Sequence, residues 1–116
     1  MGQLTTHVLD TTSGTPAKGV KWILRHVADE PLEVARGQTN ADGRSDTPLR
    51  SGSTLIVGTY ELEFQVASYF RDQGITLPEP AFLDDVVIRF GIADVSDHYH
   101  VPLLVSPYGY STYRGS

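Results

Sequence analysis

Cysteine is missing from this sequence of 116 residues. Its absence excludes disulfide bonds, zinc sites built on thiolates and a cysteine nucleophile. Blocks of like charge are missing as well, because 14 acidic and 9 basic residues are spread along the chain and leave a net charge of −5 at pH 7. A mildly acidic surface argues against nucleic acid or an anionic membrane as partner. An anionic ligand would therefore need a local site of positive charge.

The sequence also lacks long apolar runs and targeting signals. No apolar run is long enough to span a bilayer, and the segment Met1–His7 has no charged start followed by an apolar stretch. The final residues Gly115 and Ser116 do not form a peroxisomal ending of the S-K-L type. We expect a single domain over residues 1–116, located in the cytoplasm and not bound to membrane.

Common catalytic motifs are absent too. There is no glycine-rich phosphate loop, no G-x-S-x-G turn and no H-E-x-x-H pair. The nucleotide-binding, serine-hydrolase and zinc-protease classes therefore have no support in the sequence.

Alternation of apolar and polar residues is the main structural signal that is present. It predicts short strands at residues 4–9, 20–26, 32–39, 60–66, 86–92, 98–107 and 108–114. Two adjacent aromatic residues followed by Gly74 predict one short helix, about Ala67 to Gln73. Short strands separated by turn signals indicate an all-β fold, an antiparallel sandwich of two sheets. Pro102 cannot donate a ladder hydrogen bond, so we expect its strand at an edge or bulged there.

Histidines are the first candidates for chemistry. His98 and His100 are two residues apart on one predicted strand and point to the same side, which suits a metal ion or a shared substrate. His7 on the first strand is a possible third imidazole. A metal hydrolase that uses the His98/His100 pair is therefore one open alternative, although an H-x-H pair alone is a weak signal. By spacing alone, His7 is more typical of a polar surface residue.

The turn Asn40–Gly43 and the C-terminal stretch supply the other candidates. Gly43 can adopt the positive φ that closes the turn, and Arg44 follows at its exit. Residues 108–116 hold three tyrosines and an arginine, which is unusual for a chain end. We interpret this hairpin as part of an active site, with an interface role for the tyrosines as the alternative.

Five segments together resemble a known family. They are Leu4–Asp10, Gly14-x-Pro16-Ala17, Asn40–Arg44, His98–Leu104 and Tyr110–Ser116. They are similar to the 5-hydroxyisourate hydrolases of the transthyretin-like family, and the closing Tyr-Arg-Gly-Ser separates those enzymes from transthyretin, a carrier. The resemblance implies two four-stranded sheets with one short helix. It also implies a homotetramer, a dimer of dimers with active sites at the dimer–dimer interface.

The resemblance further implies which residues act. Position by position, His7, Arg44, His100 and Ser116 correspond to catalytic residues, and His98 to a possible auxiliary one. The substrate contacts implied are His7, Arg44, Tyr113 and Arg114. No metal and no organic cofactor is implied.

The implied reaction opens the six-membered ring of 5-hydroxyisourate, the product of urate oxidation, to 2-oxo-4-hydroxy-4-carboxy-5-ureidoimidazoline in purine degradation. Imidazole has an unperturbed pKa near ~6.5 and can take a proton from water and return it to the departing nitrogen. A guanidinium can hold an oxygen-rich anion and stabilise charge on the attacked carbonyl. The alternatives are a transthyretin-like carrier of a small ligand without catalysis, and the metal hydrolase.

Overall fold

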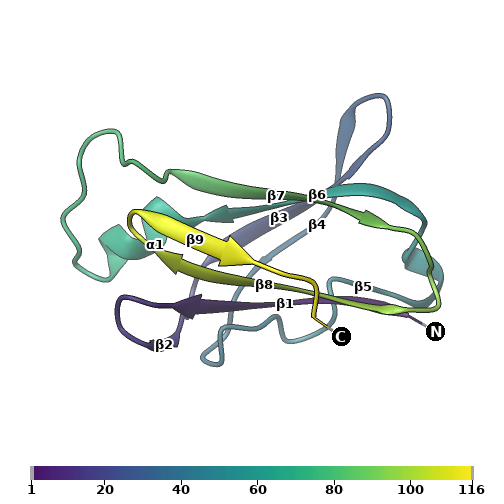
Figure 1. Ribbon diagram of the computed structural model, residues 1–116, viewed down its shortest axis with the longest axis horizontal. Helices are drawn as coiled ribbons and strands as arrows, with labels where there is room; N and C mark the ends of the chain where they lie inside the picture. Colours follow the sequence, from purple (N-terminus) through teal and green to yellow (C-terminus); the bar gives the residue numbers. More distant parts are fainter. Residues whose placement is uncertain (1, 116) are drawn as a thin grey trace.

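Two β-sheets packed face to face make up the fold (Figure 1). The computed structural model describes residues 2–115. One sheet has the order β2-β1-β8-β9, with β5 paired to β1, and the other has the order β4-β3-β6-β7. The bounds of the strands are β1 Gln3–Asp10, β2 Thr15–Pro16, β3 Lys21–Val27, β4 Pro31–Gln38, β5 Arg50–Ser51, β6 Gly58–Gln65, β7 Asp85–Ile92, β8 His98–Ser106 and β9 Gly109–Thr112. The all-β, two-sheet sandwich expected from the sequence is confirmed.

Alternation decides which side chains enter the core. Along β1, Leu4, Thr6 and Val8 are buried while Thr5 and His7 lie on the outer face. Successive side chains of a strand point to opposite faces, so β1 contributes every second residue to the space between the sheets. The largest fully buried side chains are Tyr60, Phe64, Phe70, Leu4, Leu24, Leu62, Ile92, Leu103, Val8, Val20, Val66 and Val86. The outer face of the first sheet is left free for polar residues.

One strand pair departs from the antiparallel pattern. β1 and β8 are parallel, with Gln3 opposite His98 and Asp10 opposite Val105. The other strand pairs of residues 2–115 are antiparallel. Parallel neighbours need a long connection, and here the connection is formed by the chain from β2 to β7. Alternation within a strand does not reveal the direction of its neighbour, so the sequence did not predict this pair.

The expectation for Pro102 is wrong, because β8 is an inner strand between β1 and β9 and keeps an unbroken register with β1. The Pro102 carbonyl accepts a hydrogen bond of 2.7 Å from the Thr112 hydroxyl, so its backbone groups face β9. The register with β9 stops at the next residue, where Leu103 lies opposite Thr112. The missing N–H therefore falls where the ladder to β9 already ends.

The helix α1, Val66–Asp72, confirms the expected one with a shift of one residue. It ends as predicted, because Gly74 has a φ of 84°. The Gly74 N–H donates to Arg71 and the Ile75 N–H donates to Phe70, at 3.0 Å each, which is the pattern of a glycine-closed helix end. Tyr69 of α1 donates a 2.9 Å hydrogen bond to the buried Asp10 carboxylate and so ties the helix to β1. Within residues 2–115, no helix has the length and apolarity to cross a membrane.

Candidate active site

The parallel pair β1 and β8 places the candidate histidines on one outer face. His7 lies opposite Pro102, and Thr5 lies opposite His100 in the ladder. Residues two apart on a strand share a face, so His98 and His100 lie on the same side as His7. Strands from the two ends of the chain thus bring these imidazoles together.

The turn after β4 brings Arg44 to the same face. The Asn40 side chain accepts hydrogen bonds from the backbone N–H groups of Asp42 and Arg44, at 2.9 and 3.2 Å. Gly43 packs against β1, where a Cβ atom would stand 2.4 Å from the Val8 carbonyl oxygen, and its φ is +74°. Because only glycine fits this close approach, the turn holds Arg44 in a β-bridge with His7.

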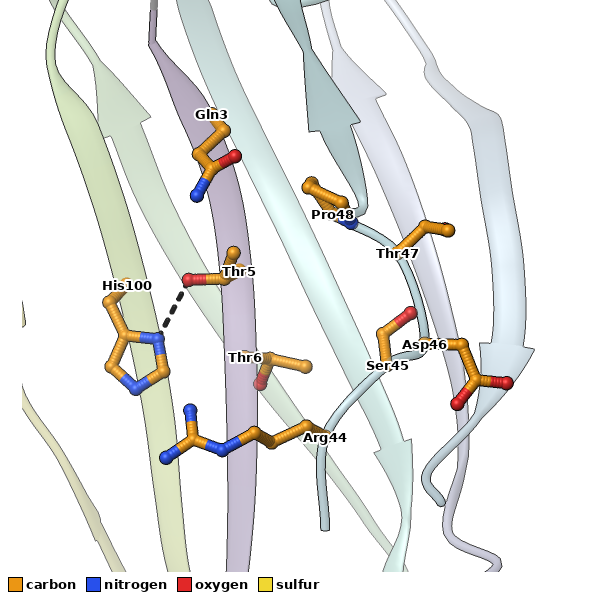
Figure 2. A pocket seen from close by; sticks show the side chains of 9 residues that line it. All are labelled: Gln3, Thr5, Thr6, Arg44, Ser45, Asp46, Thr47, Pro48 and His100. Carbon is orange, nitrogen blue, oxygen red and sulfur yellow. Dashed lines mark hydrogen bonds between the residues drawn. The ribbon is translucent and has the colours of Figure 1, made fainter. Parts of the chain in front are cut away.

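A pocket of about 510 Å³ opens beside this bridge. Figure 2 shows His100 and Thr5 on one wall, Arg44 below them and the segment Ser45–Pro48 on the opposite wall. The complete lining is Gln3, Thr5, Thr6, Arg44, Ser45, Asp46, Thr47, Pro48 and His100. Among residues 2–115, no carboxylate forms an ion pair with Arg44. Its guanidinium can therefore receive an anionic ligand.

Burial and positive charge favour the uncharged form of His100 in the pocket and of His7 beside it. Burial lowers the pKa of His100, and the charges of Arg44 and His7 lower it further. Burial and the Arg44 charge also lower the pKa of His7, with the backbone and carboxylate of Asp42 opposing them. A lowered pKa favours the neutral imidazole, which is the form that can accept a proton from water.

The C-terminal segment packs against His100. The Gly115 N–H donates a 2.8 Å hydrogen bond to the His100 carbonyl. A Cβ atom on Gly115 would lie 2.8 Å from Cδ2 of His100, so the imidazole ring occupies the space that a side chain would need. The predicted catalytic residue Ser116 lies outside the described residues.

Two of the predicted substrate contacts, Tyr113 and Arg114, do not line this pocket. Tyr113 and Arg114 line a separate groove, which faces β7. The Arg114 guanidinium lies 4.3 Å from the centroid of the Tyr99 ring and donates a 3.1 Å hydrogen bond to the His98 carbonyl. In a single chain, this arrangement holds the tail on β8. The side chain of His98 is exposed and does not line the pocket.

Thr5 and Asp46 are pocket residues that the sequence analysis did not single out. Thr5 was detectable, because it precedes His7 by two residues on a predicted strand and must share its face. Asp46 gave no comparable signal, since the loop after Arg44 has no periodicity.

The geometry does not support the metal alternative. Within residues 2–115, no three histidine, aspartate or glutamate side chains gather as metal ligands. The Arg44 charge, which lowers the pKa of His7 and His100, would also repel a cation.

Fold and pocket together define a class: a small β-sandwich with a polar pocket, lined by an arginine and a histidine, on the outer face of one sheet. Comparison with known proteins narrows the class. The HIUase/Transthyretin family profile matches residues 4–115, and the chain belongs to this family. The 5-hydroxyisourate hydrolase of Pseudomonas aeruginosa is 56% identical over 117 residues, which cover 100% of this chain and 93% of the relative.

Solved structures show the same fold. The 5-hydroxyisourate hydrolase of Klebsiella pneumoniae has a TM-score of 0.83 and 36% identity, with both chains covered completely. (S)-allantoin synthase has a TM-score of 0.94 and 44% identity over 99% of this chain, which spans 44% of that longer chain. Sea bream transthyretin in complex with thyroxine has a TM-score of 0.87 and 29% identity, covering 97% of this chain and 94% of that one. The fold is therefore common to a 5-hydroxyisourate hydrolase and a thyroxine-bound transthyretin, and the side chains must distinguish them.

Proposed function

We propose that this chain is a 5-hydroxyisourate hydrolase, which opens the six-membered ring of the product of urate oxidation. The observation that carries the proposal is the meeting of Arg44 and His100 in one pocket, with His7 bridged to Arg44. A relative that is 56% identical over the whole chain carries the name 5-hydroxyisourate hydrolase. A carrier has no need of two histidines of lowered pKa beside a guanidinium that forms no ion pair within residues 2–115, so the site favours hydrolysis over transport.

In the proposed mechanism a neutral imidazole, His100 or His7, removes a proton from water. The resulting hydroxide adds to the ring carbonyl next to N1, and the carbonyl oxygen becomes an oxyanion. The bond from this carbon to N1 then breaks, and the imidazolium returns its proton to the departing nitrogen. A positioned acid or base contributes typically ~10²–10⁴-fold to the rate.

Arg44 has two roles in this scheme. Its guanidinium holds the anionic, oxygen-rich ring and stabilises the oxyanion as it forms. It also keeps the histidines uncharged, since its charge lowers the pKa of each. The reaction needs no metal and no organic cofactor.

The C-terminal residues complete the proposal. We place Ser116 among the catalytic residues and Tyr113 and Arg114 among the substrate contacts, as the family motif implies, with His98 as an auxiliary. The contact of Arg114 with Tyr99 gives that arginine a further role in fixing the tail.

The active unit is proposed to be a homotetramer, a dimer of dimers in the cytoplasm with active sites at the dimer–dimer interface. Support comes from the tyrosines of the C-terminal hairpin, because Tyr108, Tyr110 and Tyr113 are 64%, 48% and 62% exposed in the single chain. Tyrosine is enriched at protein interfaces. A second subunit would also hold a chain terminus in the fixed geometry that catalysis demands.

The decisive experiment generates 5-hydroxyisourate freshly with a urate oxidase and follows its ultraviolet absorbance. We expect decay faster than the spontaneous rate, unaffected by chelator and lost in His100→Asn. Decay at the spontaneous rate with the unaltered protein would refute the hydrolase. Loss of activity with chelator, together with bound metal in stoichiometric amount, would restore the metal alternative.

A further inference from the structure

Within residues 2–115, the His100 ring makes one side-chain hydrogen bond, to Thr5 of β1. Thr5 Oγ1 lies 2.8 Å from Nδ1 of His100. The two residues are direct partners in the parallel ladder, and both line the pocket. In Figure 2 the other ring nitrogen, Nε2, points away from Thr5, on the side of the Arg44 guanidinium. The contact therefore does not engage Nε2, which among residues 2–115 makes no hydrogen bond.

A hydroxyl is suited to this position because it can both accept and donate a hydrogen bond. When Nδ1 carries hydrogen, it donates to Thr5 Oγ1 and Nε2 has a free lone pair. When Nδ1 is unprotonated, the hydroxyl donates to it and Nε2 carries the hydrogen. The contact thus survives in either neutral tautomer and in the imidazolium, so the ring keeps its orientation while the proton comes and goes.

The charges around the ring explain why the partner is not a carboxylate. Burial lowers the pKa of His100, and within residues 2–115 the charges of Arg44, from the loop after β4, and of His7, from β1, lower it further. Asp46 lies in the pocket wall, where it accepts a 2.9 Å hydrogen bond from Asn40, and Gly115 of the tail packs on the ring. A carboxylate at position 5 would stabilise the imidazolium and raise the pKa of His100. Thr5 orients the ring without adding charge.

We propose that Thr5 is a positioning residue for His100, fixing the imidazole with Nε2 toward the pocket throughout proton transfer. The catalytic part of this proposal rests on the proposed hydrolase function. The hydrogen bond itself does not depend on that function and can be tested without substrate.

The kinetic test compares Thr5→Val, which keeps the shape and removes the hydroxyl, with Thr5→Ser, which keeps the hydroxyl. Thr5→Val should lower kcat about 2- to 12-fold, the range that corresponds to one lost hydrogen bond, with little change in KM. The acid limb of the pH profile of kcat should move to lower pH in this variant. The imidazolium of His100 loses the Thr5 hydroxyl as acceptor, so the pKa of His100 falls. Thr5→Ser should keep both kcat and the position of this acid limb close to those of the unaltered protein. Thr59→Val, a half-buried threonine on β6 of the other sheet, is the matched control and should behave as the unaltered protein.

The structural test uses ring-nitrogen and ring-proton NMR of the substrate-free protein. In Thr5→Val, the titration of His100 should move to lower pH and its tautomer ratio should change, while His26 and His98 stay as they were. Unchanged titration and unchanged kcat in Thr5→Val would overturn the proposal, and so would a Thr5→Ser variant as impaired as Thr5→Val. If the unaltered protein fails to hydrolyse 5-hydroxyisourate but the NMR shifts occur, the hydrolase proposal fails and the Thr5 contact stands.

Discussion

At the scale of single residues, Arg44 acts on histidines from two strands. It follows a glycine turn that packs on β1, and its charge lowers the pKa of His7 and of His100. Arg44→Gln should therefore raise both pKa values toward the ordinary histidine range, while Arg44→Lys, which keeps the charge, should leave them low. NMR titration of the imidazole protons measures this directly. Equal pKa values in the Gln and Lys variants would contradict the electrostatic role.

Gly115 gives a second prediction at this scale. A Cβ atom there would lie 2.8 Å from the His100 ring, so Gly115→Ala should displace the imidazole. Because a misplacement of ~1 Å can cost ~10²-fold in rate, we expect kcat/KM to fall by about 10- to 100-fold without unfolding. Gly109→Ala is the control, since its nearest neighbour would be an ordinary 3.9 Å away. Assays of 5-hydroxyisourate decay and circular dichroism decide the outcome, and wild-type kinetics in Gly115→Ala would exclude the steric argument.

At the scale of elements, a buried hydrogen bond joins α1 to β1. Tyr69 donates to Asp10, and burial together with this bond raises the pKa of Tyr69 to about 12 from 10.0. A raised pKa favours the protonated tyrosine in the folded state, so this stabilisation is complete below pH 10 and is lost as the pH rises toward 12. Tyr69→Phe should lower the free energy of unfolding by about 1.5–3 kcal/mol near neutral pH.

The same variant should also lose less stability than the unaltered protein between pH 10 and 12. Urea unfolding at about pH 8 and about pH 11 measures both effects. Tyr108→Phe, at an exposed turn, serves as the control. A Tyr69→Phe protein as stable as the unaltered one at both pH values would show that the bond contributes nothing.

Local sequence patterns predicted the positions of the strands and the helix better than they predicted which strands lie next to each other in the sheets. Alternation placed the strands and put Thr5 and His7 on the outer face of β1, and Gly74 marked the end of α1. The parallel pairing of β1 with β8 was not predictable, because it depends on how the whole chain returns to the sheet. That pairing is what sets Thr5 against His100. The contact of Arg114 with the Tyr99 ring was not predictable from the sequence for the same reason, since Tyr99 lies on another strand.

At the scale of the whole molecule, the proposed assembly makes activity depend on protein concentration. Tyr110 is 48% exposed on β9, and a charge at this position should be tolerated by the monomer but not by an interface core. Tyr110→Glu should reduce the tetramer fraction and the hydrolase activity in parallel. Light scattering with activity assays over a dilution series measures both. Leu32→Glu, on β4 of the other sheet, is the control, and a fully active monomer would end the interface proposal.

The pairing of the C-terminal segment with β8 is interrupted opposite Pro102, and hydrogen exchange can detect this interruption. β9 ends at Thr112, which pairs with Leu103, and Tyr113 and Arg114 do not pair with β8. Gly115 then pairs with His100 in the same register. Exchange is slow where an amide hydrogen bond must open first, so the Gly115 amide should exchange more slowly than the amides of the two residues before it. Gly115 would then remain hydrogen-bonded to His100 although the two residues before it are unpaired. Its release would uncover the side of the His100 ring on which it packs. The exchange rate of a single glycine amide thus reports how often the C-terminal segment leaves the His100 ring.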